Sequence, residues 1–336
     1  MPRREEGFRV ARPIRYKRRV TSPSKAGVAL GAVIAAALTA SQAHGQKLKA
    51  PPPVTAKSVY VLNADTGQTL YRKGDGKAVR LHSLTKLIAA HVLMQRMGGR
   101  LSETVTIGPA HLTTGSSAGL RKGDVWTLQD LLYGMLLVSG NDAALAIADY
   151  TGRAMLAEEG KKGDPRKRFV REMTQSAVAL GASRAKFADP HGLSPANVGT
   201  AQEVVLIGAS VFRDERVLPF WRCAHRTLEI GGAEARTVTL TSTVEMLGED
   251  RILGAKTGSH LSKNIYNLVA GWRAPNGQTI VAVVLGSADH PARYRDMRAI
   301  LAALPRDFPE LAEPTGGPWI PGPCPEPPAP PPPFRP

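Results

Sequence analysis

The chain has 336 residues, with 44 Lys+Arg against 28 Asp+Glu, so its formal net charge is +16. An apolar fraction of 43% excludes wholesale disorder, and two cysteines exclude a disulfide scaffold or a four-cysteine zinc site. A charge this positive points to nucleic acid or an anionic surface as a partner, provided that it belongs to the folded part of the chain.

The first segment resembles an export signal. Residues 1–25 hold nine Lys/Arg and two Glu, a net charge of +7, and residues 26–40 (AGVALGAVIAAALTA) carry no charge. This apolar run is short of the roughly 20 residues that span a membrane, and the small residues Ser41 and Ala43 follow it. We therefore expect residues 1–45 to be a signal peptide or an uncleaved N-terminal anchor that contacts the inner membrane. The protein is then exported, and is either periplasmic or tethered to the outer face of the inner membrane.

The last segment is rich in proline. Residues 321–336 read PGPCPEPPAPPPPFRP, and such a run cannot donate the backbone hydrogen bonds of a helix or a sheet. We expect residues 312–336 to form a disordered tail. Because Cys324 lies in this tail, we do not expect a structural bridge to Cys223.

The body between these ends, residues 46–311, shows strand signals first and last and helix signals in between. Apolar residues recur at helical spacing in five segments, which are 84–97, 128–138 after a capping Thr127, 142–150, 168–180 and 293–304. Strands are predicted at 58–62, 68–71, 236–241, 266–272 and 279–285. The loop 63–67 and the dipeptide Asn276-Gly277 are hairpin signals. The order predicts an α+β fold in which an antiparallel sheet takes strands from both ends of the body, with helices flanking it and an all-helical region.

The first of three short motifs is Ser83-Leu-Thr-Lys86, which lies at the start of a predicted helix. The i, i+3 spacing puts the hydroxyl and the amine on one face, and the helix N-terminus stabilises negative charge there. A lysine next to a serine can act as a base only if burial or a nearby cation depresses its pKa. By itself the motif is weak, since a capping serine and a surface lysine give the same pattern.

The other two motifs follow in order along the chain. Ser139-Gly140-Asn141 lies between two apolar helical stretches, 56 residues after Ser83, where a tight turn would expose two polar side chains. Lys256-Thr257-Gly258 lies 117 residues further on, and its lysine could supply the cation that lowers the pKa of Lys86. Gly258 would permit close approach of a ligand to the backbone.

Taken together, the three motifs identify a family resemblance. Ser-x-x-Lys, Ser-x-Asn and Lys-Thr-Gly in this order are typical of penicillin-binding proteins and class A β-lactamases. The chain resembles the low-molecular-mass penicillin-binding proteins, specifically the serine-type D-alanyl-D-alanine carboxypeptidases, from about residue 54 to residue 304. Further segments that carry the resemblance are 139–143, 173–181, 187–193 and 266–270.

The resemblance implies a β-lactamase/transpeptidase-like fold and an activity. The enzyme would remove the terminal D-alanine from peptidoglycan stem pentapeptides through a serine acyl-enzyme, would regulate cell-wall crosslinking, and would bind β-lactam antibiotics covalently. It would need no cofactor and no metal. Many family members add a second β domain and an amphipathic C-terminal helix, and we expect neither here.

The resemblance also assigns roles to residues. Ser83 would be the nucleophile and Lys86 its base, with Ser139 as the third catalytic residue that passes a proton to the leaving group. The substrate-binding residues would be Asn141, Lys256, Thr257, Gly258 and Ser259. The backbone N–H groups of Ser83 and Ser259 would form the oxyanion hole. Arg293 and Arg295 are candidates for binding the terminal carboxylate. His82 replaces a small residue of the family, and we expect its side chain to face solvent.

Several other functions compete with this interpretation. A D,D-endopeptidase that cleaves peptidoglycan crosslinks would use the same serine chemistry. A class A β-lactamase would need a glutamate-bearing loop between the second and third motifs, and residues 161–197 show no Glu-x-x-Leu-Asn. A non-catalytic peptidoglycan-binding protein would not need all three motifs. Nucleic-acid binding is disfavoured because the basic residues of the body are scattered and no nucleic-acid-binding motif occurs.

Overall fold

The main sheet joins the two ends of the described chain. The computed structural model describes residues 52–74 and 76–305, and the expected leader and tail lie outside them. Five antiparallel strands lie in the order β2-β1-β11-β10-β9. Their bounds are Ser58–Asn63 (β1), Thr69–Lys73 (β2), Ile252–His260 (β9), Ile265–Arg273 (β10) and Thr279–Leu285 (β11). The predicted sheet with strands from both ends is therefore confirmed, and β9, which no strand signal had marked, is its edge strand.

Helices cover both faces of this sheet, which explains why its inner strands are apolar throughout. Val281 and Val283 of β11 belong to the core beneath α6 (Ala201–Phe212), whereas Ala282 and Val284 belong to the core beneath α8 (His290–Ala302). Side chains alternate between the faces of a strand, so a strand that is buried on both faces loses the apolar–polar alternation. The α6 helix was not predicted.

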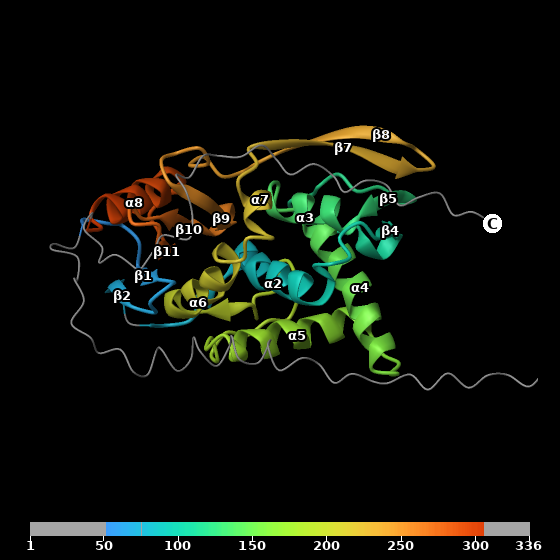
Figure 1. Cartoon of the computed structure of the whole chain (residues 1–336), viewed down its shortest axis with the longest axis horizontal. Coiled ribbons are helices and arrows are strands. Elements are labelled where there is room, and N and C mark those ends of the chain that lie inside the picture. Colours follow the sequence, from blue (N-terminus) through green and yellow to red (C-terminus); the bar gives the residue numbers. More distant parts are fainter. Residues whose placement is uncertain (1–51, 75, 306–336) are drawn as a thin grey trace, which may run out of the picture.

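The helical region lies beside the sheet (Figure 1). Its helices are α2 (Lys86–Met97), α3 (Leu128–Leu136), α4 (Asn141–Glu158), α5 (Pro165–Ala179) and the short α7 (Leu218–Trp221), with 3-10 turns η1 (His82–Thr85), η2 (Pro109–His111) and η3 (Leu261–Lys263). The predicted capping of α3 is confirmed, since the Thr127 hydroxyl accepts from the Asp130 N–H and Asp130 in return caps Thr127. Helix α4 extends well beyond the predicted residue 150.

A second, four-stranded sheet has the order β4-β5-β7-β8 and was only partly predicted. Its strands are Thr104–Thr106, Asp124–Thr127, His225–Gly232 and Arg236–Thr241, and the long β7–β8 hairpin runs along the top of the molecule in Figure 1. The two-residue strands β3 (Val79–Arg80) and β6 (Val198–Gly199) pair with each other. Buried Asp124 at the start of β5 forms an ion pair with Arg236 at the start of β8, and so fastens the hairpin to β5.

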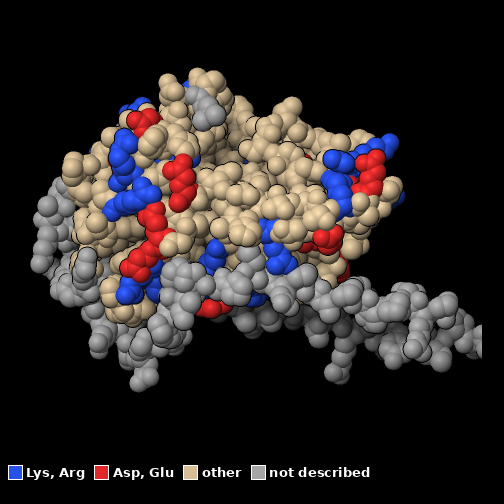
Figure 2. Space-filling model, turned by 90° about the horizontal axis from the view of Figure 1, so that it is seen from above, with Lys and Arg blue, Asp and Glu red and all other residues tan. Residues whose placement is uncertain are grey.

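Two further observations bear on expectations from the sequence. Cys223 is buried and disulfide-bonded, contrary to the expectation of no bridge, and the chain's other cysteine lies outside the described residues. On the face seen in Figure 2, basic and acidic side chains lie next to one another at two sides of a largely uncharged centre. The positive charge is therefore not gathered into one basic surface on this face.

Among the described helices, none combines the length and the apolar character needed to cross a membrane.

Candidate active site

Ser83 lies in the 3-10 turn η1, immediately before α2. The helix predicted from residue 84 begins instead at Lys86, because residues 82–85 form this tighter turn. Ser83 is half-buried and Lys86 is fully buried, and the Lys86 Nζ lies 3.1 Å from the Ser83 Oγ. The turn therefore presents the hydroxyl at the surface while the amine stays in the interior.

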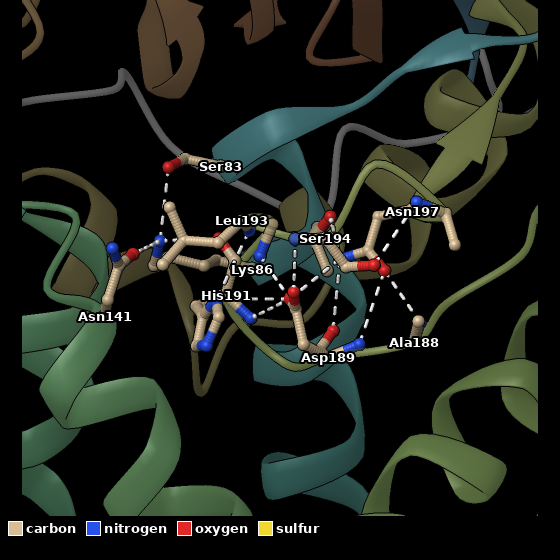
Figure 3. A network of polar contacts seen from close by, with 12 residues as sticks. Ser83, Lys86, Asn141, Ala188, Asp189, His191, Leu193, Ser194 and Asn197 are labelled. Atoms are coloured by element: carbon tan, nitrogen blue, oxygen red, sulfur yellow. Dashed lines mark hydrogen bonds and ion pairs between the residues drawn. The ribbon is translucent and has the colours of Figure 1, made fainter. Parts of the chain in front are cut away.

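The Lys86 side chain is held by oxygen atoms from three separate segments (Figure 3). Its Nζ donates to the Asn141 Oδ1 at 2.8 Å and to the His191 backbone carbonyl at 2.8 Å, in addition to Ser83. Burial, and next the positive charge of Lys256, hold the pKa of Lys86 well below its usual value. The second cause is the one anticipated from the sequence. A lowered pKa favours the neutral amine, and a neutral amine can accept the proton of the neighbouring hydroxyl.

Lys256 makes a matching contact from the edge strand β9. It is fully buried, and its Nζ donates to the Ser139 Oγ at 2.8 Å. Burial, with the Arg293 guanidinium nearby, lowers the pKa of Lys256 to about 7. The site therefore holds two lysine–serine pairs, Lys86 with Ser83 and Lys256 with Ser139, and the charge of Lys256 lowers the pKa of Lys86.

The turn that carries Ser139 and Asn141 is strained and tightly packed. Ser139 has φ +60°, a left-handed conformation that is costly for residues other than glycine. A Cβ at Gly140 would lie 2.9 Å from the Ala118 nitrogen and 2.7 Å from the Asp142 Oδ1. The Asp142 carboxylate in turn accepts from the Ala118 N–H at 2.9 Å. Only glycine therefore fits between the two polar residues of this motif.

The loop over residues 187–197 supplies the His191 carbonyl that contacts Lys86. The residues that hold this loop in shape were not assigned from the sequence. The Asp189 carboxylate accepts from the N–H groups of His191, Gly192 and Ser194, and from the Asn197 Nδ2 at 2.8 Å (Figure 3). The Asn197 Nδ2 also lies 3.2 Å from the Thr85 Oγ1 in η1. An aspartate before Pro190 was a turn signal that could have found this loop. The result is a fixed carbonyl at His191 facing Lys86.

The same loop packs against the backbone just before Ser83. Gly192 has φ +99°, and a Cβ there would lie 1.9 Å from the carbonyl oxygen of His82. We expect Gly192→Ala to lower the free energy of unfolding by about 2–4 kcal/mol, because the added methyl group meets backbone in a conformation that already disfavours alanine. Urea denaturation measures this.

The matched control for that substitution is Gly160→Ala. Gly160 also has positive φ, at +64°, but a Cβ there would meet nothing within 4 Å. It should cost only about 1 kcal/mol, the conformational part alone. Equal losses in the two variants would contradict the close contact between Gly192 and His82.

The edge strand β9 lies close to the segment that leads into η1, and Arg293 of α8 contacts it. A Cβ at Gly258 would lie 2.6 Å from the Leu81 carbonyl oxygen, so a side chain there would force the strand away. The Arg293 Nη1 donates to the Ser259 Oγ at 2.5 Å, and Arg293 is buried. Arg295 instead pairs with Asp289 at 3.5 Å and is largely exposed. Of the two candidate arginines, Arg293 is the one at this site.

His82 does not face solvent, and that expectation is wrong. Its side chain is 9% exposed and its ring lies 5.4 Å from the ring of His260, edge to face. Its φ of +50° turns the chain sharply before Ser83, and this is what directs the ring toward β9 rather than outward. Burial, followed by the charges of His260, Arg80 and Lys263, lowers the pKa of His82 to about 4.

Comparison with known proteins places this geometry in context. Residues 45–289 match the family model described as D-alanyl-D-alanine carboxypeptidase. The chain is 28% identical over 267 residues to the D-alanyl-D-alanine carboxypeptidase of Streptomyces sp. strain K15, with 74% of this chain and 87% of that protein covered. It is 26% identical over 261 residues to DacC of Escherichia coli K12, covering 74% of this chain and 61% of DacC, so it spans about three fifths of that relative's length.

Solved structures of similar proteins also match this chain. The Streptomyces K15 DD-transpeptidase superposes with a TM-score of 0.69 at 29% identity, and the match covers 76% of this chain and 98% of that one. Penicillin-binding protein 6B of E. coli has a TM-score of 0.65 at 23% identity, covering 78% of this chain and 81% of its own, and therefore shares the fold.

Proposed function

Because the chain belongs to the D-alanyl-D-alanine carboxypeptidase family, we propose that it removes the terminal D-alanine from peptidoglycan stem pentapeptides through an acyl-enzyme on Ser83. The observation that carries this proposal is the buried Lys86, whose Nζ lies 3.1 Å from the Ser83 Oγ and whose pKa is well below the usual lysine value. A serine hydroxyl is a weak nucleophile, and an adjacent neutral amine is what activates it.

The first chemical step forms the acyl-enzyme. The Ser83 Oγ attacks the carbonyl carbon of the penultimate D-alanine while its proton moves to the Lys86 Nζ. The negative charge on the carbonyl oxygen is then met by the backbone N–H groups of Ser83 and Ser259. Losing one such donor costs about 10²–10³ in rate in well-studied hydrolases. The hydrogen bonds from Lys86 to Asn141 and His191 fix the amine so that its lone pair can face Ser83.

The second step expels D-alanine and regenerates the enzyme. The tetrahedral intermediate collapses, the C–N bond breaks, and the leaving amine takes a proton through Ser139. Lys256 supplies the charge behind Ser139, to which its Nζ donates at 2.8 Å. Water then attacks the ester carbonyl, with its proton taken up by the same lysine–serine network, and Ser83 leaves as the hydroxyl.

Substrate binding follows from the position of β9. As the edge strand of the main sheet, it can pair with an extended peptide through backbone hydrogen bonds. Thr257, Gly258 and Ser259 of this strand would contact the substrate, and Asn141 would hold the substrate amide from the opposite side. Arg293, which already contacts Ser259, would bind the terminal carboxylate of the substrate.

Intact mass after incubation with benzylpenicillin tests the proposal. We expect one covalent adduct per chain, and peptide mapping should place it on Ser83, because the β-lactam carbonyl occupies the position of the scissile amide. The same preparation should release D-alanine from a D-Ala-D-Ala pentapeptide. A chain that forms no adduct under conditions where the pentapeptide is also left intact would contradict the assignment.

Two alternatives within the same chemistry are separated by substrate. A D,D-endopeptidase would cleave crosslinked dimers faster than the free pentapeptide. A β-lactamase would turn penicillin over instead of retaining the adduct. The motif form Ser139-Gly140-Asn141, in which no side chain fits at residue 140, supports the carboxypeptidase over the β-lactamase.

We further propose that the enzyme works outside the cytoplasm, where peptidoglycan lies. The support is the basic and apolar leader pattern of residues 1–45, which lie outside the described residues. Sequencing the N-terminus of the exported protein would show whether this segment is removed or remains as an anchor in the inner membrane.

A further inference from the structure

Four nitrogen-bearing side chains lie together beside the nucleophile, and we name Arg80, His82, His260 and Lys263 the basic cluster. Strand β3 ends at Arg80 and leads through His82 into Ser83, while β9 ends at His260 and η3 ends at Lys263. The two histidine rings are 5.4 Å apart, and the Asn267 Nδ2 donates to the Arg80 carbonyl at 3.3 Å. These contacts join the two segments at the end of the edge strand.

The basic cluster has no acidic partner among the described residues. The charged groups that act on His82 are His260, Arg80 and Lys263, all of them basic. The ion pairs of the described chain include neither Arg80 nor Lys263, and both side chains are exposed. The His82 Nε2 is buried without a hydrogen-bond partner in this part of the structure. Two cations without an ion pair, next to a buried nitrogen without a hydrogen bond, are features of a site that can bind an anion.

The path of the substrate leads to this cluster. A peptide that pairs antiparallel with β9, its terminal carboxylate at Thr257 and Arg293, runs opposite to the strand. Its preceding residues then pass Ser259 and arrive at His260 and η3. The residue before the two D-alanines is thus the part of the substrate that meets the basic cluster.

We propose that the basic cluster is a specificity site for a carboxylate on the residue that precedes D-Ala-D-Ala. This inference rests on the proposed function. Arg80 and Lys263 supply the charge at the rim, and the rings of His82 and His260 lie beside them. A stem peptide with a free carboxylate at this residue is the preferred substrate, and one in which that carboxylate is amidated is a poorer one.

Two peptides of the same shape test this, acetyl-L-Glu-D-Ala-D-Ala and acetyl-L-Gln-D-Ala-D-Ala. We expect kcat/KM for the glutamate peptide to be higher by about threefold to tenfold at low salt, the range that two exposed ion pairs provide. The preference should shrink as ionic strength rises, because exposed charges are screened. The double variant Arg80→Gln/Lys263→Gln should lose the preference and keep its rate on the glutamine peptide.

Arg171→Gln is the matched control, since Arg171 is an exposed arginine on α5, a helix that packs against α4 and α2 (Figure 1). It should retain the full preference. Equal rates on the two peptides in the unaltered enzyme, or a preference that survives in the double variant, would overturn the specificity site. If neither peptide is hydrolysed at all, the proposed function itself has failed.

Discussion

Ser83→Ala should abolish D-alanine release and penicillin binding together. We expect kcat/KM on a D-Ala-D-Ala pentapeptide to fall by at least about 10³-fold, because removing the nucleophile of a covalent mechanism leaves only binding and the oxyanion donors. The side chain is half-buried and its contact is with Lys86, so the fold should persist. Stopped assays of released D-alanine and intact mass with benzylpenicillin measure the two losses on one preparation.

Ser102→Ala is the control for that variant, since Ser102 is exposed in the turn after α2 and belongs to none of the three motifs. It should keep both activities. If Ser83→Ala lost the penicillin adduct but still hydrolysed the pentapeptide, Ser83 would be the site of penicillin binding but not the nucleophile of hydrolysis. The proposed serine mechanism would then be wrong. Thermal unfolding of both variants excludes a loss through misfolding.

Replacing Lys86 should have the second-largest effect, and its size should depend on pH. In the proposed mechanism Lys86 is a base only when it is unprotonated, so kcat/KM should rise with pH along a limb set by its pKa. Burial and Lys256 hold that pKa well below the usual lysine value. Lys86→Arg keeps a charge that does not dissociate in this range and should lose at least about 10³-fold without recovery at high pH. A pH profile of kcat/KM for both forms checks this.

Lys256 gives that profile an independent test. In Lys256→Met the positive charge near Lys86 is gone while burial remains, so the pKa of Lys86 rises and the ascending limb moves to higher pH. An unmoved limb would mean that another group controls it. A limb that moves to lower pH would contradict the electrostatic coupling of the two lysines.

Sequence signals correctly predicted the turns and the helix cap that depend only on neighbouring residues. The hairpin of β1 and β2, the Thr127 cap and the Asn276-Gly277 turn depend on residues near in sequence, and they are where they were expected. Strand β9 was missed because it contains Lys256, Thr257 and two glycines, which weaken the strand pattern of its sequence. Tertiary position, and not propensity, makes this segment a strand.

Some residues of the site could also be predicted from the sequence, and others could not. The motif residues could be named from their order along the chain, because each motif has a fixed chemical composition. The roles of Asp189 and Asn197 could not, since they bind backbone groups of a loop whose shape is not visible in the sequence. The outward orientation expected for His82 was wrong for a related reason. Its direction depends on a positive φ and on the neighbouring His260, which is far away in the sequence.

The strand order of the main sheet has a consequence for how the protein matures. Strand β11, near the end of the described chain, lies between β10 and β1, which is near its beginning. Strand β9, which carries Lys256, joins the sheet only through β10. Pairings between such distant segments form late, because the intervening chain must first be closed into a loop. A chain that is still being synthesised therefore holds Ser83 and Lys86 without Lys256 or Arg293. In the proposed mechanism, catalytic competence therefore arises only when the last strands join the sheet.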